Sequence, residues 1–212
     1  MTKPSVLAWK EPAQARGRAR VAAILDAAAG LAVEQGHLDF KMTTVAERAG
    51  VPIGSLYQFF PSRTALVARL FAREMEPIDQ SLRTGLEGVQ SVDGVLEGIS
   101  ALIKEHVALV KARPTLFVIW TSPTMEPALQ DADFANSQAN AARITERLLT
   151  LAGDPIDETA IRATALLVCH LWGHVVRLSI LVDENGDPPD DVIDQYIAMM
   201  EAHFRALLVS RS

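Results

Sequence analysis

The sequence predicts an all-α fold, with a small N-terminal helix-turn-helix domain and a larger C-terminal helical domain. Apolar residues recur at helical spacing along most of the chain, and no segment shows the alternation typical of a strand. Gly and Pro residues separate these periodic segments. The 212 residues, 49% of them hydrophobic and 22% charged, are enough to bury a core in one or two domains.

The most specific pattern begins at Thr43. Thr43 and Thr44 are expected to cap a short helix, because a side-chain oxygen there satisfies backbone N–H groups. Gly50 suits the left-handed conformation that ends a helix, and Pro52 blocks its continuation. Two short helices joined by such a turn form a helix-turn-helix, whose second helix can lie in the major groove of DNA.

The second short helix is expected to open at Gly54 or Ser55. Its large apolar residues Leu56, Phe59 and Phe60 are assigned to the core of the domain. Ser62 then resembles the N-cap of a long fourth helix, in which Pro77 is expected to cause a kink or an end.

The charge distribution also favours a nucleic-acid partner for the N-terminal part. The whole chain carries a net charge of −6, yet residues 1–75 carry +4 and residues 76–212 carry −10. A basic segment joined to an acidic body suits a protein that contacts phosphates with one end only. Chance clustering is the alternative, and Arg16, Arg18 and Arg20 are equally compatible with solvated charge or with phosphate contacts.

The expected organisation is an arm over 1–15, a helix-turn-helix domain over 16–62 and a regulatory and dimerisation domain over 63–212. The arm contains Trp9 and is expected to be flexible. Each remaining helix is bounded by Gly, Pro or polar capping residues. The expected helices span 17–35, 93–112, 114–121, about 127–152, 154 to about 183, and about 189–209.

Several features indicate a cytoplasmic protein. The N-terminus lacks the apolar core of a signal peptide. The most apolar stretch, Ala163–Val182, contains two His and an Arg, so a buried helix explains it better than a membrane span. The single Cys169 cannot form an intrachain disulfide and is consistent with a reducing compartment.

The N-terminal motif resembles that of the TetR family of bacterial transcriptional repressors. The resemblance covers roughly residues 17–70, from an apolar helix ending in Glu34-Gln35-Gly36 to Ser62-Arg63. Its longest matching runs are 46–51 and 54–60. The resemblance implies a homodimer with a DNA-binding head and a ligand-responsive body, and it implies no enzymatic activity and no cofactor.

Site residues follow from this resemblance, residue by residue. The resemblance implies phosphate contacts by Thr43 or Thr44, by Tyr57 and by Arg63. Arg63 stands where family members often carry Lys, and its guanidinium still suits a phosphate. Candidates for facing base edges are small residues or residues able to pair with bases: Pro52, Ile53, Gly54, Ser55 and Gln58.

The last two helices are apolar around most of their circumference, so they need partners on several sides. A two-fold four-helix interface between subunits would supply those partners. Burial within one subunit is the alternative. The resemblance favours the dimer.

The region expected to form the ligand-responsive body is rich in aromatic residues and methionines of the kind that line apolar ligand pockets. Candidates for binding a small, apolar effector are Phe71, Met75, His106, Phe117, Trp120, Met125, Phe134, Trp172 and His174. For any one of them, ordinary core packing is the better explanation, and the sequence does not identify the effector.

Two other functions compete with a ligand-controlled repressor. His170 and His174 share a helix face at a spacing that suits a metal or an enzyme site, but two such residues make no complete site and no metal is predicted. A DNA-binding protein without any effector is the second alternative. Substitution of His170 and His174 would discriminate between the metal or enzyme alternative and the repressor. Stabilisation of the protein by a ligand would discriminate between the effector-free alternative and the repressor.

Overall fold

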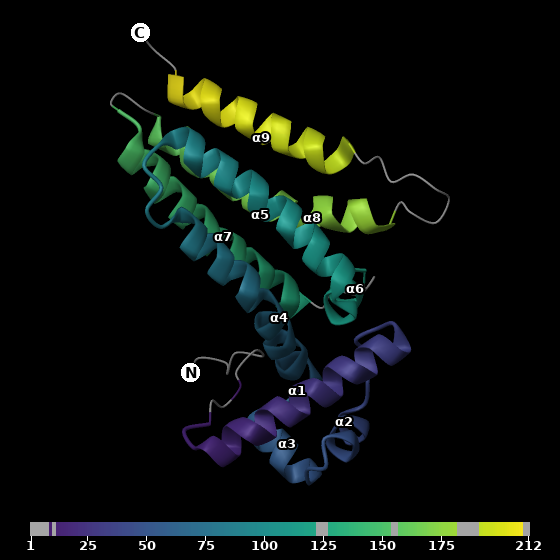
Figure 1. Cartoon of the computed structure of the whole chain (residues 1–212). Helices are drawn as coiled ribbons and strands as arrows, with labels where there is room; N and C mark the ends of the chain where they lie inside the picture. Colours follow the sequence, from purple (N-terminus) through teal and green to yellow (C-terminus); the bar gives the residue numbers. More distant parts are fainter. Residues whose placement is uncertain (1–8, 10–11, 122–126, 154–156, 182–190, 210–212) are drawn as a thin grey trace. The chain divides into compact units, whose positions relative to one another are not determined.

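The computed structural model describes residue 9 and residues 12–121, 127–153, 157–181 and 191–209. The described residues form nine helices and no strand, which confirms the all-α expectation (Figure 1). The helices are α1 (Ala15–Gln35), α2 (Met42–Arg48), α3 (Ile53–Phe59), α4 (Arg63–Leu86), α5 (Val92–Ala112), α6 (Pro114–Thr121), α7 (Pro127–Leu151), α8 (Glu158–Leu181) and α9 (Asp191–Val209).

The chain forms two compact units. The first comprises Met1–Glu76 and Arg113–Ala132, and the second comprises Pro77–Ala112 and Asp133–Ser212. Helix α4 contributes to both units, because it continues through Pro77 rather than ending there. Helix α6 belongs to the first unit, although its neighbours along the chain, α5 and most of α7, belong to the second.

The first unit packs α2 and α6 against α1, and α3 against α2. The predicted apolar stripe of α1 is buried as expected, and Ile24 and Ala28 have no exposed surface. Leu56 from α3 and Phe60 just after it are likewise fully buried, which confirms their assignment to the core. Phe59 is only half-buried.

The second unit is built from long helices that run side by side (Figure 1). Helix α8 packs on α9, and α5 contacts both of them. The core contains Leu96 and Ile99 from α5, Ile161 from α8 and Phe204 from α9, each fully buried. Helix α7 is linked to the second half of α4 by a hydrogen bond from Asn140 Nδ2 to Asp79 Oδ1 of 3.2 Å.

Several expected helix boundaries are wrong by a few residues. Helix α1 begins at Ala15, and α3 begins at Ile53, with Pro52 at its N-cap. The expected cap at Thr43 and Thr44 is wrong, because α2 already begins at Met42 after Lys41, without a side-chain cap. The two threonines therefore lie in the first turn of α2.

Other local expectations are confirmed. Gly50 adopts φ 64°, the left-handed conformation that the turn after α2 requires. Ser62 Oγ accepts a hydrogen bond of 3.1 Å from the Ala65 N–H and so caps α4. The cap expected at Asp154-Pro155 lies outside the described residues, and the carboxylate of Asp157 accepts a hydrogen bond from the Ala160 N–H at the start of α8.

Trp9, which was expected to lie in a flexible arm, packs on the first unit. Its ring stacks on the buried Phe60 with a centroid separation of 6.0 Å and an interplanar angle of 14°. The guanidinium carbon of Arg69 lies 4.8 Å from the Trp9 ring centroid. The cation–π contact and the stacking together explain why this position departs from the expectation.

Helix α8 contains the one described segment, Glu158–Ser179, that is long and apolar enough to span a membrane by length and composition. Core helices of soluble proteins satisfy the same criterion. Because α8 packs on α5 and α9 and includes His170 and His174, we interpret it as a helix of the protein core.

Candidate nucleic-acid interface and ligand-binding region

The turn between α2 and α3 is held by backbone hydrogen bonds and by a buried side chain on each of the two helices. The N–H of Val51 donates to the Ala46 carbonyl at 3.0 Å, and the N–H of Gly50 donates to the Glu47 carbonyl at 3.1 Å. Val45 and Leu56 are fully buried, one on each helix. These contacts determine which face of α3 points away from the core.

The exposed face of α3 carries the residues expected to face base edges. Positions 53 and 57, and positions 54 and 58, are four residues apart and lie on adjoining rows of the helix. The side chains of Ile53 and Tyr57 are 39% and 48% exposed, and Gln58 is exposed as well. Leu56 points the opposite way into the core. Four of the expected DNA-facing residues of α3 therefore lie on one accessible surface: Ile53, Gly54, Tyr57 and Gln58.

The other candidate DNA contacts lie around α3. Pro52 is exposed at the N-cap of α3, and Ser55 is half-buried. Thr43 is exposed and Thr44 half-buried in the first turn of α2, where backbone N–H groups point outward and favour an anion.

Arg63, the first residue of α4, forms an ion pair with Asp39 of the segment that precedes α2. Both side chains are accessible to solvent. No local pattern in the sequence predicts this pairing, because 24 positions separate the two residues. Arg63 is thus held in place by a carboxylate that a phosphate could replace.

A second ion pair joins α1 to α2. Arg48 donates two hydrogen bonds, of 2.5 and 2.6 Å, to the carboxylate of Glu34. These hydrogen bonds from Arg48 lower the pKa of Glu34. A side chain on Gly30 would clash with this guanidinium, since an added Cβ would lie 2.9 Å from Arg48 Nη2. Glycine at this position therefore leaves room for a bidentate contact.

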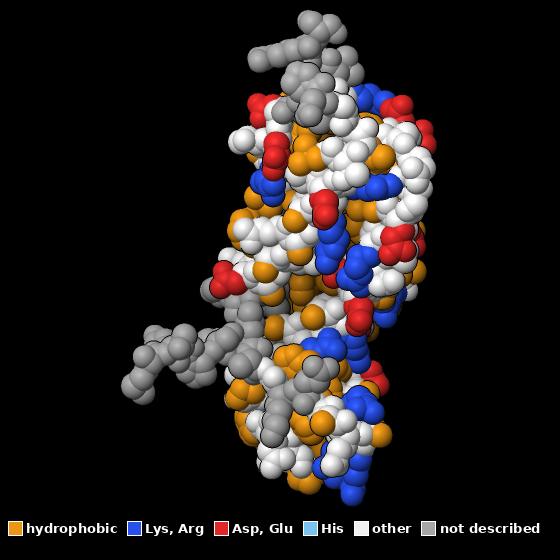
Figure 2. Space-filling model, turned by 90° about the vertical axis from the view of Figure 1, so that its left-hand side faces the viewer, with side chains coloured by type: hydrophobic (Ala, Val, Ile, Leu, Met, Phe, Trp, Pro, Cys, Tyr) orange, Lys and Arg blue, Asp and Glu red, His pale blue; other side chains and the backbone are white. Residues whose placement is uncertain are grey.

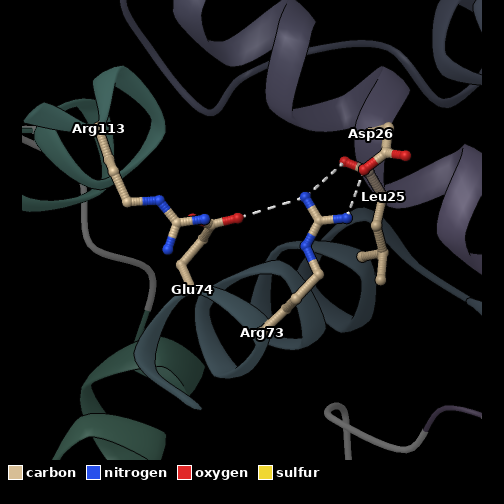
Figure 3. A network of polar contacts seen from close by, with 5 residues as sticks. All are labelled: Leu25, Asp26, Arg73, Glu74 and Arg113. Carbon is tan, nitrogen blue, oxygen red and sulfur yellow. Dashed lines mark hydrogen bonds and ion pairs between the residues drawn. The ribbon is translucent and has the colours of Figure 1, made fainter. Parts of the chain in front are cut away.

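A buried carboxylate organises the contacts among α1, α4 and the start of α6 (Figure 3). Glu74 on α4, whose side chain is 5% exposed, forms ion pairs with Arg73 at 3.3 Å and with Arg113 at 3.1 Å. Arg73 also donates a 2.7 Å hydrogen bond to Asp26 on α1. Arg113 is the residue at which the chain enters the first unit. The network therefore holds the start of α6 on the same unit as α3.

The residues expected to bind an effector do not gather in one described cluster. Phe71, Met75 and Phe117 belong to the first unit, where the first two are buried and Phe117 is 41% exposed. The side chain of Trp120 and the whole of Met125 lie outside the described residues.

In the second unit, one pair of expected residues is in direct contact, and a second pair is linked through His170. The rings of His106 and Trp172 are both buried, with centroids 5.5 Å apart. Burial lowers the pKa of His106 to about 4, so its imidazole is neutral at pH 7. A small apolar cleft of about 100 Å³ lies beside His106 and is lined by Ile78, Leu102 and Leu109, among others.

The second pair, Phe134 and His174, lies where α7 and α8 meet, and each of the two contacts His170. Phe134 packs edge-on against His170 at 5.4 Å, and the His170 and His174 rings are 5.7 Å apart. The pKa of Asp133 is raised, because the effect of its burial outweighs the opposing effect of the nearby His170 and His174. Within the described ranges, no group of three or more His, Cys, Asp or Glu side chains is arranged to hold a metal ion.

An exposed apolar stripe runs along α8. Leu167, Leu171 and Leu178 are 58%, 40% and 48% exposed, and His174 is exposed between the last two. Their spacing places all four on one helix face. Hydrophobic side chains also reach the surface at several places on the face that Figure 2 shows. An accessible stripe of leucines is typical of a surface that another protein covers.

An all-helical chain with a helix-turn-helix whose second helix leaves one face exposed belongs to the class of helix-turn-helix DNA-binding proteins. Comparison with known families identifies the class further. Residues 24–70 match the family described as "Bacterial regulatory proteins, tetR family", and residues 94–208 match "Tetracyclin repressor-like, C-terminal domain". The chain belongs to the TetR family of transcriptional regulators, which is a family of DNA-binding proteins rather than enzymes.

One similar curated protein is the HTH-type transcriptional repressor KstR of Mycolicibacterium smegmatis, 33% identical over 122 residues. That match covers 56% of this chain, and the chain spans 60% of the length of this relative. A TetR-family transcriptional regulator from Streptomyces coelicolor has a similar structure, with 25% identity, a TM-score of 0.64, and coverage of 89% of this chain and 99% of that one.

The fold is also shared with the regulator FadR of Bacillus subtilis, whose crystal structure is a complex with stearoyl-CoA. The identity is 16% and the TM-score is 0.60, over 90% of this chain and 99% of that one. At this identity the likeness concerns the fold alone.

Proposed function

We propose that this chain is an effector-responsive transcriptional repressor that binds a palindromic DNA operator as a homodimer. The observation that carries the proposal is the exposed face of α3, formed by Ile53, Gly54, Tyr57 and Gln58 opposite the buried Leu56. Membership of the TetR family and the repressor function of the KstR relative both support it.

Each candidate contact has a separate role in this proposal. Gln58 can pair with a base edge in the major groove, and the small Gly54 allows the helix to approach closely. The hydroxyls of Thr43 and Tyr57 hold phosphates. Arg63 exchanges its ion pair with Asp39 for one with a phosphate, so that its guanidinium contributes to the electrostatic attraction to DNA.

Dimerisation through α8 and α9 would cover the stripe of Leu167, Leu171 and Leu178. A two-fold interface pairs the same stripe on both subunits. The two α3 helices of the dimer would then lie in successive major grooves, about 34–36 Å apart. The cytoplasm, where such an operator is found, is the proposed location.

Release from the operator would require an effector that binds the non-DNA-binding state more tightly, because equal affinity for both states shifts nothing. The apolar lining of the cleft beside His106 supports a small, apolar effector in the second unit. At about 100 Å³ the cleft must widen to admit such a ligand, since ligand pockets span roughly 300–1,000 Å³.

The connectivity of α6 supports a route for this response. Helices α5 and α7 belong largely to the second unit, whereas α6, between them in the chain, packs on α1 of the first. A ligand that moves α5 or α7 pulls on α6 through the peptide chain. The ion pair of Arg113 with Glu74 resists that pull at the point where α6 begins.

The proposal is tested by selecting from a random duplex pool with the purified full chain at a stated, moderate salt concentration. Enrichment of an inverted repeat is expected. If no sequence is enriched, even after stripping of bound ligand and refolding, sequence-specific operator binding is ruled out. Effector dependence is then tested by thermal shift with diverse apolar compounds, and saturable stabilisation by one chemical class is expected.

A further inference from the structure

A pocket of about 380 Å³ lies in the second unit, where the end of α4 and the turn after it meet α7. Three arginines line it: Arg83 from α4, and Arg143 and Arg147 from α7. The second unit contains nine Lys and Arg residues against seventeen Asp and Glu, a net charge of −8. That three of its few basic residues share one pocket is therefore unexpected for a surface of average composition.

The three guanidinium groups bond to neutral acceptors. Arg83 donates to the side-chain oxygen of Gln80 at 2.7 and 3.1 Å. Arg143 donates to Asn140 Oδ1 at 2.8 Å, and Arg147 donates to the carbonyl of Val89. Within the described part of the chain, no carboxylate comes within ion-pair distance of any of the three. Their positive charges are therefore not neutralised by a direct partner.

The acidic groups described around the pocket form no ion pair with these three arginines. Asp79 is separated from Arg143 by Asn140, whose side-chain amide bridges them by hydrogen bonds of 3.2 and 2.8 Å. Glu87 and Glu146 also line the pocket but are exposed. Arg143 and Arg147 are four residues apart on α7, so they share a helix face and repel one another.

The Arg147 side chain adds a buried donor. Its Nε atom is shielded from solvent and has no hydrogen-bond partner among the described residues. A buried donor without a partner is costly, and for a charged group more so. An anion in the pocket would relieve the repulsion between the arginines, and it would compensate the charge of this guanidinium.

We propose that this pocket binds a phosphate or diphosphate group of a small molecule. Guanidinium groups form paired hydrogen bonds with phosphate oxygens, and three positive charges match a multiply charged phosphate better than a single carboxylate. The volume suffices for such a group with a small attached moiety. This site goes beyond the proposed repressor function and does not depend on it, because no contact with DNA is involved.

The test is isothermal titration of the full chain with pyrophosphate, without DNA, in chloride buffer at constant ionic strength. Saturable binding at one site per chain is expected. Arg83→Gln and Arg143→Gln should each weaken it about tenfold or more, as expected for the loss of a charge-assisted hydrogen bond. Glu87→Gln should strengthen it, since a negative charge at the pocket is removed.

Two control variants separate this site from other basic surfaces. Arg177→Gln makes the same change of charge on α8 of the same unit, outside the pocket, and should leave binding unchanged. Arg63→Gln alters the candidate DNA surface and should also leave it unchanged. Circular dichroism and urea unfolding establish that each variant is folded.

Three outcomes would overturn the proposal. The first is the absence of saturable binding across the millimolar range. The second is binding that survives in both Arg83→Gln and Arg143→Gln, or that disappears in Arg63→Gln instead. The third is tighter binding of malonate than of pyrophosphate, which would assign the pocket to carboxylates. None of these outcomes bears on operator selection, so failure here and failure of the repressor function are distinguishable.

Discussion

The guanidinium of Arg113 lies 3.1 Å from the carboxylate of Glu74, so the residue at which the chain re-enters the first unit is tied to α4 (Figure 3). Arg73 joins the same carboxylate to Asp26 of α1. A buried carboxylate with two cationic partners thus links three elements of the unit that carries α3. This arrangement leads to the first prediction.

Glu74→Gln should destabilise the protein by about 1–3 kcal/mol, because two guanidinium groups lose the charge that faces them. The matched control is Glu158→Gln, which breaks an exposed i,i+4 pair with Arg162 on α8 and should cost about 0.5 kcal/mol or less. Urea unfolding measures both values. Similar small losses for the two variants would contradict a structural role for the Glu74 network.

The recognition face of α3 yields a prediction about specificity. Gln58→Ala should relax the base preference at one position of the operator by about 1–3 kcal/mol, if Gln58 pairs with a base. Tyr57→Phe, which removes only a hydroxyl, should weaken binding to all duplexes equally, by about 1 kcal/mol. Fluorescence anisotropy on selected and scrambled duplexes measures both. Equal losses on both duplexes for Gln58→Ala would rule out base reading by Gln58.

The accessible stripe on α8 yields a prediction about assembly. Leu171→Arg should convert the proposed dimer to a monomer, because it would place like charges opposite each other across a two-fold axis and leave each without a partner. Val33→Arg, at an exposed apolar position on α1, is the matched control and should leave the dimer intact. Sedimentation velocity measures the mass. A dimer that persists in Leu171→Arg would place the interface elsewhere.

The buried His106 predicts a dependence of stability on pH. Its pKa of about 4 in the folded chain lies below the ordinary 6.5, so the unfolded chain binds this proton first as pH falls. Above about pH 6.5, His106 is neutral in both states and does not lower the free energy of unfolding. As the pH falls from about 6.5 to 4, the free energy of unfolding decreases by up to about 3 kcal/mol.

His106→Phe should remove this part of the pH dependence, which urea unfolding at pH 7 and pH 4.5 measures by comparison with the unmodified chain. Phenylalanine keeps a planar ring beside Trp172, so packing is largely retained. His203→Gln, at an exposed position on α9, serves as the control and should leave the pH dependence as it is. An identical pH dependence in His106→Phe would contradict the assignment.

The sequence predicted those parts of the fold that depend on neighbours along the chain. The Gly50 turn and the Ser62 cap use hydrogen bonds within a few residues. The spacing of the apolar residues in α1 predicts which face of the helix is buried. The start of α2 was misplaced because threonine has a strong capping preference, whereas Met42 begins the helix since its side chain is buried in the core.

Contacts between distant residues could not be predicted in this way. The Arg63–Asp39 pair, the inclusion of α6 in the first unit and the arginine pocket each join segments whose separation gives no local signal. The prediction that certain aromatic residues bind an effector rests on residue type alone. Residue type does not distinguish the buried Phe71 from Phe134, which lies accessible beside His170.

The most direct test of sequence-specific binding by a dimer is the affinity of the full chain for its selected inverted repeat and for a version with about five extra base pairs between the half-sites. Half a helical turn moves one half-site to the opposite side of the duplex. A dimer with two fixed recognition helices should lose most of its specific affinity on the lengthened duplex. Equal affinity for the two duplexes would contradict the dimeric, two-site recognition proposed for this protein.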